Sequence, residues 1–486
     1  MNTKKRNNII ILKVLFIAWL IITFVSATTH EPWIDEIYAW QISKFSIRDI
    51  FYEMRYEGHF ALWYLILYPF SHLNAPLKWL NILSWFINSI SILYFVYKSP
   101  FNALEKISLM FSSIFLYYYP VISRCYVLLP IMLFILADLY SRYLVNDDDY
   151  VFLCMCIVIG LIANVHVYTE GFAISMGLIL FIDVIKKWNT YSFKERNKRV
   201  FSLSIPIVLA LIAFLQVLPS LNYSSVFVSG NEMGGGIQVF LSSIGISNRI
   251  EKLLTILLVI ITIVYITAKD FRLGFVSIIS MAYMAAINKL VYSSLIPNRN
   301  SMWFLFIIFS LWIVSKKRID CKNDTTTKII TSLFIISISL FTFDVDLNLF
   351  DYKNKYSGES IFADYVKNNI KEDECLYSNP NPWCEAIIEY LPNYNIRNIE
   401  NGLILKKDVD PKKINIGFAI NEIESLFSNN ENEYIYIIDC INSTDNNSKI
   451  IIEELGLGYE YEILYPHNNN DDYFLKYYLI KVQNTK

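Results

Sequence analysis

Residues 9–27, IIILKVLFIAWLIITFVSA, form an apolar run, and WIDEIYAW at 33–40 follows shortly after it. A helix needs about 20 apolar residues to cross roughly 30 Å of hydrocarbon, so this run is long enough to span a membrane. It is too long for a signal peptide and has no small-residue cleavage site, so we expect a retained helix. The chain then places two adjacent carboxylates, Asp35 and Glu36, where it leaves the bilayer.

The composition of the whole chain is that of a polytopic α-helical membrane protein. Of 486 residues, 55% are hydrophobic and only 18% are charged, with a mean hydropathy of +0.38, whereas soluble domains carry about 25% charged residues. The net charge is −2 and no basic patch typical of nucleic-acid binding occurs, so we expect no nucleic-acid partner. Hydropathy predicts about eleven transmembrane helices, at 9–27, 76–97, 105–122, 126–145, 150–168, 170–185, 200–218, 251–268, 273–288, 300–315 and 329–344.

Basic clusters orient these helices, because Lys and Arg gather in cytoplasmic loops. If the basic residues at 4–6 lie inside, the eleven-helix count also places the clusters at 186–199 and 316–318 inside. An odd number of crossings then puts residues 345–486 outside. The pattern predicts a multi-pass protein of the cytoplasmic (plasma) membrane, with its N-terminus inside and its C-terminal region outside.

The two predicted domains are a transmembrane catalytic domain, residues 1–344, and an extracytoplasmic domain, residues 345–486. The second is polar and alternates helix-like with strand-like stretches, which favours a small α/β domain. The helix-like stretches are SIFADYVKNNI, PWCEAIIEYL and SKIIIEELG, and the strand-like ones are ECLYS, EYIYIIDC, YEYEILY and YFLKYYLIKV. Neither a G-x-G-x-x-G motif nor a P-loop is present, so no nucleotide site is predicted there.

The first outer loop, residues 28–75, is long and rich in aromatic residues. WIDEIYAWQISKF and IRDIFYEMRY read as short amphipathic helices at the membrane interface, and EGHFALWYLILYPF is a third apolar stretch. This loop carries four candidate site residues, Asp35, Glu36, Glu57 and His59.

Ionisable side chains also stand at the outer ends of later predicted helices. Arg124 lies in SRCY, His166 in HVYTE and Arg299 in PNR. Ionisable groups at membrane depth cost about 2.5–3.5 kcal/mol on insertion scales, so they tend to mark a site or a pathway. Each alone could be a side chain that snorkels to lipid phosphates or caps a helix. Their common membrane face predicts a polar cavity of mixed charge that opens to the outer leaflet.

These residues recur in the order of a known family. The matching segments are Asp35-Glu36, the H-P-P-L-x-Y-like run from His59 to Tyr64, the R-x-Y-x-L run from Arg124 to Leu128, His166 and Arg299. Together they resemble the GT-C superfamily of membrane glycosyltransferases, in particular the protein mannosyltransferase-like and aminoarabinose transferase-like group (glycosyltransferase families 39 and 83). Phe60 and Ala61 replace the prolines that usually follow the histidine.

The resemblance implies a transferase of the bacterial cell envelope that faces outward. Its donor would be a polyprenyl-phosphate sugar held in membrane lipid, and its acceptor a glycan, a lipid or a protein. In this scheme Asp35 is the base, Glu36 is its partner or a metal ligand, and Arg124 and Arg299 bind the departing phosphate. A single displacement would invert the anomeric carbon.

The remaining candidate residues follow from the same resemblance. Glu57, His59, Tyr126 and His166 would contact substrate. No organic cofactor is predicted. A divalent cation stays an open alternative, with Asp35, Glu36 and His166 as its candidate ligands.

Two other classes of protein fit part of this pattern. A transporter or flippase of lipid-linked sugars would distribute charges through the depth of the bundle and show pseudo-repeated halves. Asp138 and Asp183 are possible intramembrane acids, but no matching halves occur. A polysaccharide polymerase or ligase would share the donor and centre on a large outer loop. The Gly-rich loop at 219–250 could suit a lid over the substrate.

Overall fold

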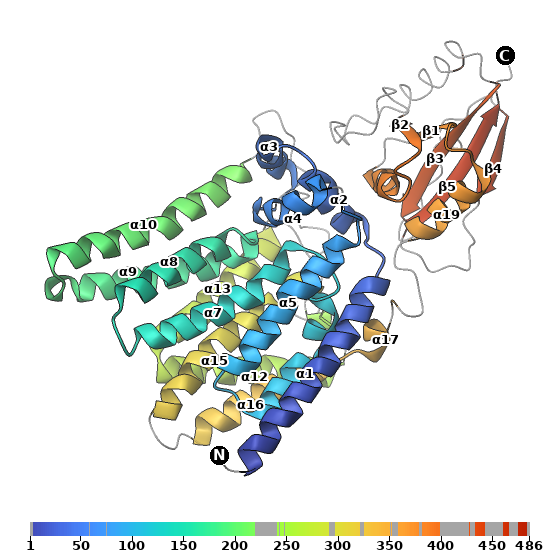
Figure 1. The fold of residues 1–486 in the computed structure, drawn as a ribbon. Helices are drawn as coiled ribbons and strands as arrows, with labels where there is room; N and C mark the ends of the chain where they lie inside the picture. The colour runs from blue at the N-terminus through green and yellow to red at the C-terminus, as the bar shows by residue number, and fades with distance from the viewer. Residues whose placement is uncertain are drawn as a thin grey trace. The chain divides into compact units, whose positions relative to one another are not determined.

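The computed structural model divides the chain into two compact units (Figure 1). The helical unit comprises Met1–Thr28 and Ala39–Leu349, and the sheet unit comprises Thr29–Tyr38 and Phe350–Lys486. The structure describes residues 3–57, 59–73, 75–218, 241–242, 244–246, 248–290, 297–320, 325–349, 351, 358–378, 382–398, 427, 433–442, 460–465 and 475–483.

Long apolar helices build the helical unit. Within the described residues, seven helices are long and apolar enough to cross a membrane. They are α1 (Thr3–Thr29), α5 (Trp79–Lys98), α7 (Leu128–Tyr143) with the 3-10 turn before it, α9 (Glu170–Lys186), α10 (Phe193–Gln216), α12 (Arg249–Lys269) and α13 (Phe271–Leu290). Further helices complete the unit, among them α8 (Asp149–Ala163), α14 (Pro297–Asn300), α15 (Met302–Asp320), α16 (Thr325–Phe341) and α17 (Val345–Asn348). The predicted polytopic helical fold is confirmed.

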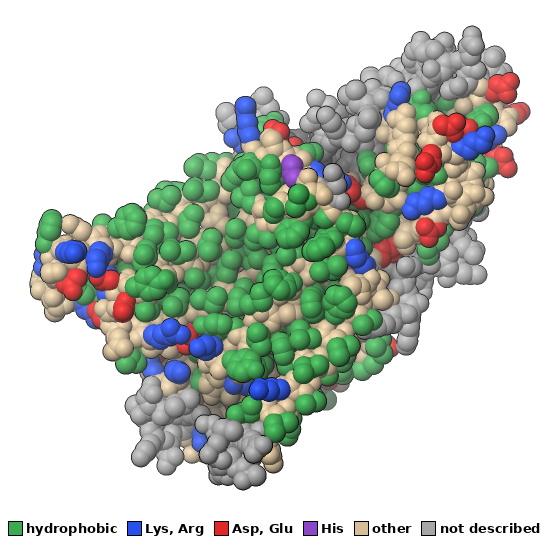
Figure 2. Space-filling view, in the orientation of Figure 1, with side chains coloured by type: hydrophobic (Ala, Val, Ile, Leu, Met, Phe, Trp, Pro, Cys, Tyr) green, Lys and Arg blue, Asp and Glu red, His purple; other side chains and the backbone are tan. Residues whose placement is uncertain are grey.

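The outer flank of this unit is apolar, as a bilayer requires. Figure 2 shows apolar side chains covering most of the visible flank, with charged side chains gathered toward its edges. Several large apolar side chains of α1, α10 and α12 are about half exposed, including Ile21 at 60%, Ile207 at 60% and Leu257 at 52%. In water such a surface would be unfavourable, whereas lipid satisfies it at no cost.

The predicted helix over 105–122 is divided. α6 (Ala103–Met110) ends early, and a single π-helical turn, Ile114–Tyr118, follows it. Irregular backbone at membrane depth is tolerated where it is buried in protein and its polar groups are satisfied. Here Trp19 Nε1 donates to the Phe115 carbonyl at 3.0 Å, and Ser113 Oγ accepts from the Asp344 amide at 2.9 Å. Tertiary hydrogen bonds therefore replace the helical ones that the break removes.

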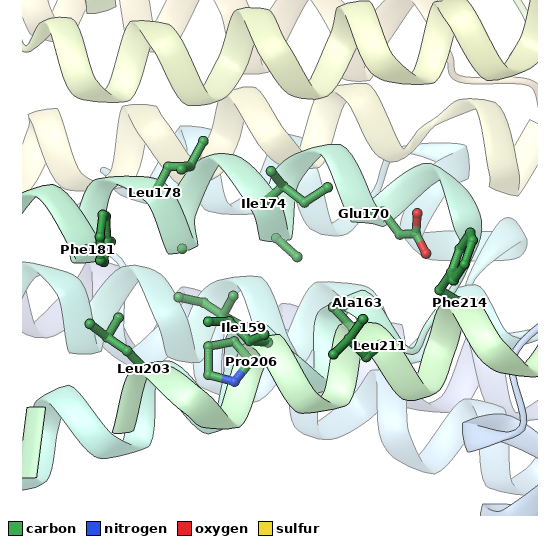
Figure 3. Close-up of a pocket in the computed structure, with 14 residues that line it drawn as sticks. Ile159, Ala163, Glu170, Ile174, Leu178, Phe181, Leu203, Pro206, Leu211 and Phe214 are labelled. Atoms are coloured by element: carbon green, nitrogen blue, oxygen red, sulfur yellow. The ribbon is translucent and has the colours of Figure 1, made fainter. Parts of the chain in front are cut away.

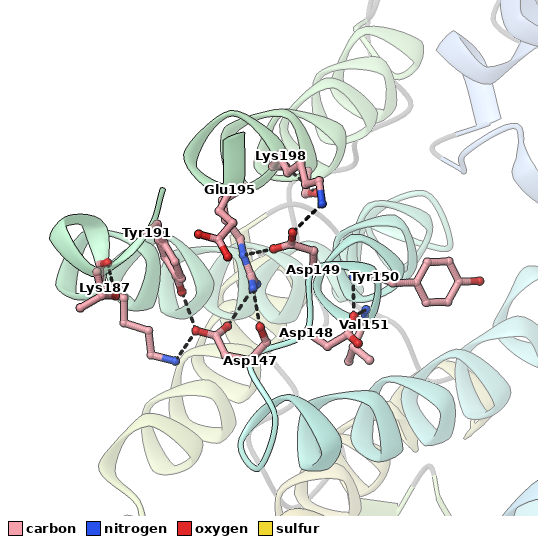
Figure 4. Close-up of polar contacts among 12 residues, drawn as sticks. Asp147, Asp148, Asp149, Tyr150, Val151, Lys187, Tyr191, Glu195 and Lys198 are labelled. Carbon is pink, nitrogen blue, oxygen red and sulfur yellow. Dashed lines mark hydrogen bonds and ion pairs between the residues drawn. The ribbon is translucent and has the colours of Figure 1, made fainter. Parts of the chain in front are cut away.

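Ion pairs join two neighbouring parts of the helical unit (Figure 4). One part is the α7–α8 connection with the start of α8, and the other is the α9–α10 connection with the start of α10. Arg199 is 1% exposed and contacts Asp147 at 2.9 Å and Asp149 at 3.1 Å. Lys187 pairs with Asp147 and Lys198 with Asp149, each at 2.9 Å. The basic cluster predicted to be cytoplasmic thus gathers at one end of the bundle.

The two possible intramembrane acids lie near helix ends and have basic partners. Asp138, in the last turns of α7, pairs with Arg142 and accepts a hydrogen bond from Tyr94 Oη at 3.0 Å. Asp183, near the end of α9, pairs with Arg272 at 3.3 Å. Both acids therefore form ion pairs near helix ends, whereas a transporter would be expected to distribute charges through the depth of the bundle.

The loop at 28–75 forms three short helices, two where amphipathic helices were predicted and one within the third apolar stretch. They are α2 (Ile34–Ser43), α3 (Ile47–Glu57) and α4 (Leu62–His72). Hydrophobic residues of all three, among them Trp40, Met54 and Trp63, belong to the buried core of the helical unit. The loop is therefore packed structure and not a bare connector. Residues 219–240 of the predicted lid lie outside the described residues.

The sheet unit contains a mixed five-stranded sheet with strand order β2-β1-β3-β5-β4. β1 is parallel to β2 and β3, and β5 is antiparallel to β3 and β4. The strands are β1 (Cys375–Ser378), β2 (Asn395–Asn398), β3 (Tyr434–Asn442), β4 (Tyr461–Tyr465) and β5 (Leu475–Gln483). Four of them coincide with the predicted strand-like stretches.

Helices of the sheet unit agree less closely with the prediction. α19 (Glu359–Asn369) forms where SIFADYVKNNI predicts a helix, and its Phe362 stacks on Tyr477 of β5. The PWCEAIIEYL stretch is a 3-10 helix, Pro382–Glu389, instead of an α-helix. β2 was not predicted, and SKIIIEELG lies outside the described residues. The core of this unit is nevertheless continuous from α19 across β1, β3 and β5.

Candidate active site

Arg124 lies at the start of α7, where the chain turns from irregular structure into the helix. It precedes a 3-10 turn, Cys125–Val127, and only 6% of its surface is exposed. Its Nη2 lies 3.0 Å from Nε2 of His59, just before α4. A guanidinium can only donate hydrogen bonds, so His59 Nε2 must accept this one. His59 is therefore neutral, with its proton on Nδ1.

His166 occupies the same kind of position at the start of α9. It caps the 3-10 turn Val167–Thr169, and its Nδ1 accepts from the Tyr168 amide at 3.1 Å. Burial, reinforced by the positive charge of Arg299, holds the pKa of His166 well below its usual value. The imidazole is therefore neutral and carries its proton on Nε2. Its ring lies 5.3 Å from the His59 ring, centroid to centroid.

Arg299 reaches the same cluster from the short helix α14. Its Nε donates to Tyr126 Oη at 2.9 Å, and its guanidinium carbon lies 5.7 Å from the centre of the Tyr126 ring. The Tyr126 ring in turn lies 5.2 Å from that of His166. Like Arg124, Arg299 is 6% exposed. Four distant segments of the chain thus place two guanidiniums, two neutral imidazoles and a phenol in one continuous group.

A buried amide network supports this arrangement, and the sequence analysis did not find it. The Ala61 amide, two residues after His59, donates to Gln216 Oε1 at 2.7 Å. Gln216 Nε2 donates to Asn164 Oδ1 at 3.4 Å, and Asn164 precedes His166 by two residues. The network therefore joins the His59 segment to the His166 segment through the end of α10. The sequence signal for this network was the presence of amide side chains, Asn164 and Gln216, within otherwise apolar runs.

The two predicted catalytic carboxylates belong to the sheet unit. Asp35 and Glu36 stand in the first turn of α2, where an N-terminal helix dipole favours negative charge. Asp35 is partly exposed, whereas Glu36 is fully buried. Glu36 Oε2 accepts from the Trp33 amide at 3.2 Å and contacts His30 Nε2 at 2.9 Å. The side chain of Glu57, at the end of α3, lies outside the described residues.

The candidate metal ligands Asp35, Glu36 and His166 gain no support from local geometry. Within the part of the chain that the structure describes, no group of three or more His, Cys, Asp or Glu side chains is arranged to hold a metal ion. Glu36 Oε2 and His166 Nδ1 already accept hydrogen bonds.

An apolar groove of about 560 Å³ lies between α8, α9 and α10 (Figure 3). It begins at Glu170, four residues after His166, and follows α9 through Ile174 to Phe181. Glu170 itself accepts a hydrogen bond from Tyr283 Oη at 2.8 Å. A Cβ atom added at Gly177 would meet nothing within 4 Å, so this residue leaves the groove open. Apart from Glu170, its lining is apolar, which suits a hydrocarbon chain.

Comparison with known proteins identifies the architecture. No sequence-family model matches the chain, and no curated protein matches it in sequence. The solved structures that match it over nearly their full length include ArnT from Cupriavidus metallidurans bound to undecaprenyl phosphate and the same protein in the apo state. The TM-scores are 0.56 and 0.57, the identities are 10% and 11%, and each match covers 96% of this chain and 97% of the other. The chain has the GT-C fold.

This result confirms the resemblance that the motifs suggested. The GT-C fold also accounts for the combination of a polytopic helical unit with a small C-terminal sheet unit. At 10% and 11% identity the comparison establishes the fold. The chemistry has to be inferred from the side chains of the candidate site.

Proposed function

We propose that this protein is a membrane glycosyltransferase that moves a sugar from a polyprenyl-phosphate donor to an acceptor on the outer face of the cytoplasmic membrane. The observation that carries the proposal is the buried group of Arg124, Arg299 and their neutral partners, which lie near the starts of α4, α7 and α9 and in α14. Support also comes from the fold, which is shared with a protein whose structure contains undecaprenyl phosphate.

The chemistry of this group suits the phosphate of such a donor. Guanidiniums form short, charge-assisted and often paired hydrogen bonds with phosphate oxygens. Because burial lowers the local dielectric, these bonds stabilise the negative charge that develops as the sugar–phosphate bond breaks. Neutral His166, with Nε2 protonated, can add a donor without adding positive charge.

The lipid part of the donor has a natural place beside this group. The groove along α9 begins at Glu170, and its other lining residues are apolar. Lining side chains such as Ile174 and Leu211 are also about half exposed on the flank of the bundle. We assign the groove to part of the polyprenyl chain, which would then enter from the bilayer while the phosphate meets the arginines.

Asp35 is our candidate for the base. It is partly exposed at the start of α2, so an acceptor hydroxyl could reach it from water. Proton removal by a positioned carboxylate accelerates transfer by about 10²–10⁴-fold. Attack on the side opposite the leaving phosphate would invert the anomeric carbon. Glu36 is buried and hydrogen-bonded, which suits a supporting role more than a basic one.

The orientation of the protein follows from charge. The cluster of Lys187, Lys198 and Arg199 lies beyond the end of α9, whereas His166 lies at its start. Basic ends face the cytoplasm. The candidate site would therefore face outward, toward a donor whose sugar has already crossed the membrane.

The test compares Asp35→Asn with the wild type and with Asp49→Asn, a matched change at an exposed residue of α3. Reconstituted protein would be given a polyprenyl-phosphate sugar and an outer-face acceptor. We expect Asp35→Asn to lower turnover by about 10²–10⁴-fold with donor binding retained, and Asp49→Asn to change neither. Near-normal turnover in Asp35→Asn would reject the base. Wild-type protein that moves the intact donor across the membrane without transferring its sugar would favour the flippase.

A further inference from the structure

The segment that carries Asp35 and Glu36 belongs to the same compact unit as the C-terminal residues. Thr29–Tyr38 groups with Phe350–Lys486, whereas the residues before and after this segment, Met1–Thr28 and Ala39–Leu349, form the helical unit. Contacts between these two parts of the sheet unit are polar, buried and specific. They lie within a few residues of Asp35.

The first contact is a buried ion triad centred on His30. Its Nε2 lies 2.9 Å from Glu36 Oε2, and its Nδ1 lies 3.0 Å from Asp351 Oδ1. All three side chains are at most 2% exposed. Because each ring nitrogen faces a carboxylate oxygen, the ring donates from both nitrogens and is an imidazolium. Burial alone would lower the pKa of His30, but Glu36 and Asp351 together raise it to about 10.

The second contact is made by the next residue, Glu31. Its carboxylate accepts from the Gly358 amide at 3.3 Å and from the Ser360 amide at 2.7 Å. These amides stand at the N-terminus of α19, where Gly358 (φ +89°) has no side chain with which to cap the helix. Glu31 is 4% exposed and supplies the missing cap from a distant part of the chain.

Two further groups complete these contacts. Tyr390 Oη donates to the Pro32 carbonyl at 3.1 Å, which fixes the residue between Glu31 and Trp33. Glu359 is fully buried beside Glu31, and burial followed by the Glu31 charge raises the pKa of Glu359 well above its usual value. Burial and the neighbouring Glu31 therefore favour the protonated form of Glu359.

We propose that His30 and Glu31 are positioning residues, through which the C-terminal sheet sets the orientation of the first turn of α2 and hence of Asp35. In this arrangement Glu36 is a fixed link to His30, neither a base nor a metal ligand. The C-terminal residues would then act in catalysis by holding the carboxylate segment. The inference depends on the proposed function only in taking Asp35 as the base.

The first test uses His30→Gln and Asp351→Ala in the full-length protein, with Asp364→Ala as the matched control on the exposed side of α19. A shift of about 1 Å in a catalytic group can cost about 10²-fold in rate, so we expect kcat to fall by roughly 10–100-fold. Binding of a polyprenyl phosphate without sugar should keep its wild-type Kd. Asp351→Asn, which keeps a hydrogen-bond acceptor, should recover part of the lost kcat. Asp364→Ala should match the wild type.

A second measurement separates positioning from general instability and from failure of the proposed function. Hydrogen exchange of the peptide spanning residues 33–37 should speed up in His30→Gln and Asp351→Ala, while melting of the helical unit stays unchanged. Because both variants break one triad, the double variant should lose no more kcat than either single one. Unchanged exchange, or faster exchange with normal kcat, would overturn the proposal. An inactive wild type would refute the proposed function. Hydrogen exchange would still show whether the His30–Asp351 contact holds residues 33–37 in place.

Discussion

Replacing Arg299 by Lys tests the phosphate-binding group most directly, because it keeps the charge and removes the planar fork. Arg299 is 6% exposed, and its Nε donates to Tyr126 Oη at 2.9 Å. A lysine has three donors on one nitrogen and cannot hold the tyrosine while presenting paired donors to phosphate. At least one charge-assisted hydrogen bond is lost, worth about 1.5–3 kcal/mol. Since about 1.4 kcal/mol is tenfold in affinity, binding of a polyprenyl phosphate should weaken by roughly 10–150-fold.

The assay measures the Kd of a polyprenyl phosphate and of the matching polyprenol for protein in nanodiscs. The phosphate ligand should lose affinity in Arg299→Lys, whereas the polyprenol should not, because it lacks the group that the guanidinium would contact. Arg196→Lys, the same change near the opposite end of the bundle, is the control and should bind both ligands normally. An unchanged Kd for the phosphate ligand in Arg299→Lys, or an equal loss for both ligands, would refute the assignment.

Two predictions concern the groove and the orientation. A Cβ atom at Gly177 would meet nothing within 4 Å, so Gly177→Leu adds a side chain that would compete with a hydrocarbon chain in the groove, and overpacking costs about 1–3 kcal/mol. We therefore expect it to weaken binding of a long polyprenyl phosphate and leave a short-chain one unaffected, in competition binding of the two ligands. Gly160→Leu, whose Cβ would lie 2.5 Å from Leu209, should instead lower the melting temperature, and equal effects on both chain lengths in Gly177→Leu would contradict the groove assignment. A reporter fused after Lys486 should be active only outside the cytoplasm, and a reporter active inside would reverse the proposed orientation.

Local patterns in the sequence predict much of this fold. Apolar runs such as 9–27 and 251–268 must be helices in a bilayer, because only a helix satisfies its own backbone there. The alternation in EYIYIIDC and YFLKYYLIKV likewise predicts β3 and β5. Helix order and basic clusters also place Arg124, His166 and Arg299 on one face of the membrane, and the structure brings these residues into one group through His59 and Tyr126.

Other features depend on partners that no local pattern specifies. The break between α6 and the π-helical turn is stabilised by hydrogen bonds to Trp19 of α1 and to the Asp344 amide, which lies between α16 and α17. The spacing of apolar residues in PWCEAIIEYL fits both an α-helix and a 3-10 helix. In the structure this stretch packs against β3 and is a 3-10 helix. β2 is four residues long and, among the described strands, pairs only with β1, so its sequence carries too little pattern to be recognised.

The difference between what local sequence predicts and what tertiary contacts decide is clearest at residues 9–40. Hydropathy along 9–27 and the adjacent carboxylates of WIDEIYAW are local properties, and they suffice to predict a membrane helix followed by a polar turn. The pairing of His30 with Asp351 joins residues 321 positions apart, and the capping of α19 by Glu31 spans a similar separation. Such contacts form because a buried charge must find a partner wherever the folded chain supplies one. Only the tertiary structure could assign Glu36 to His30 and leave Asp35 partly exposed.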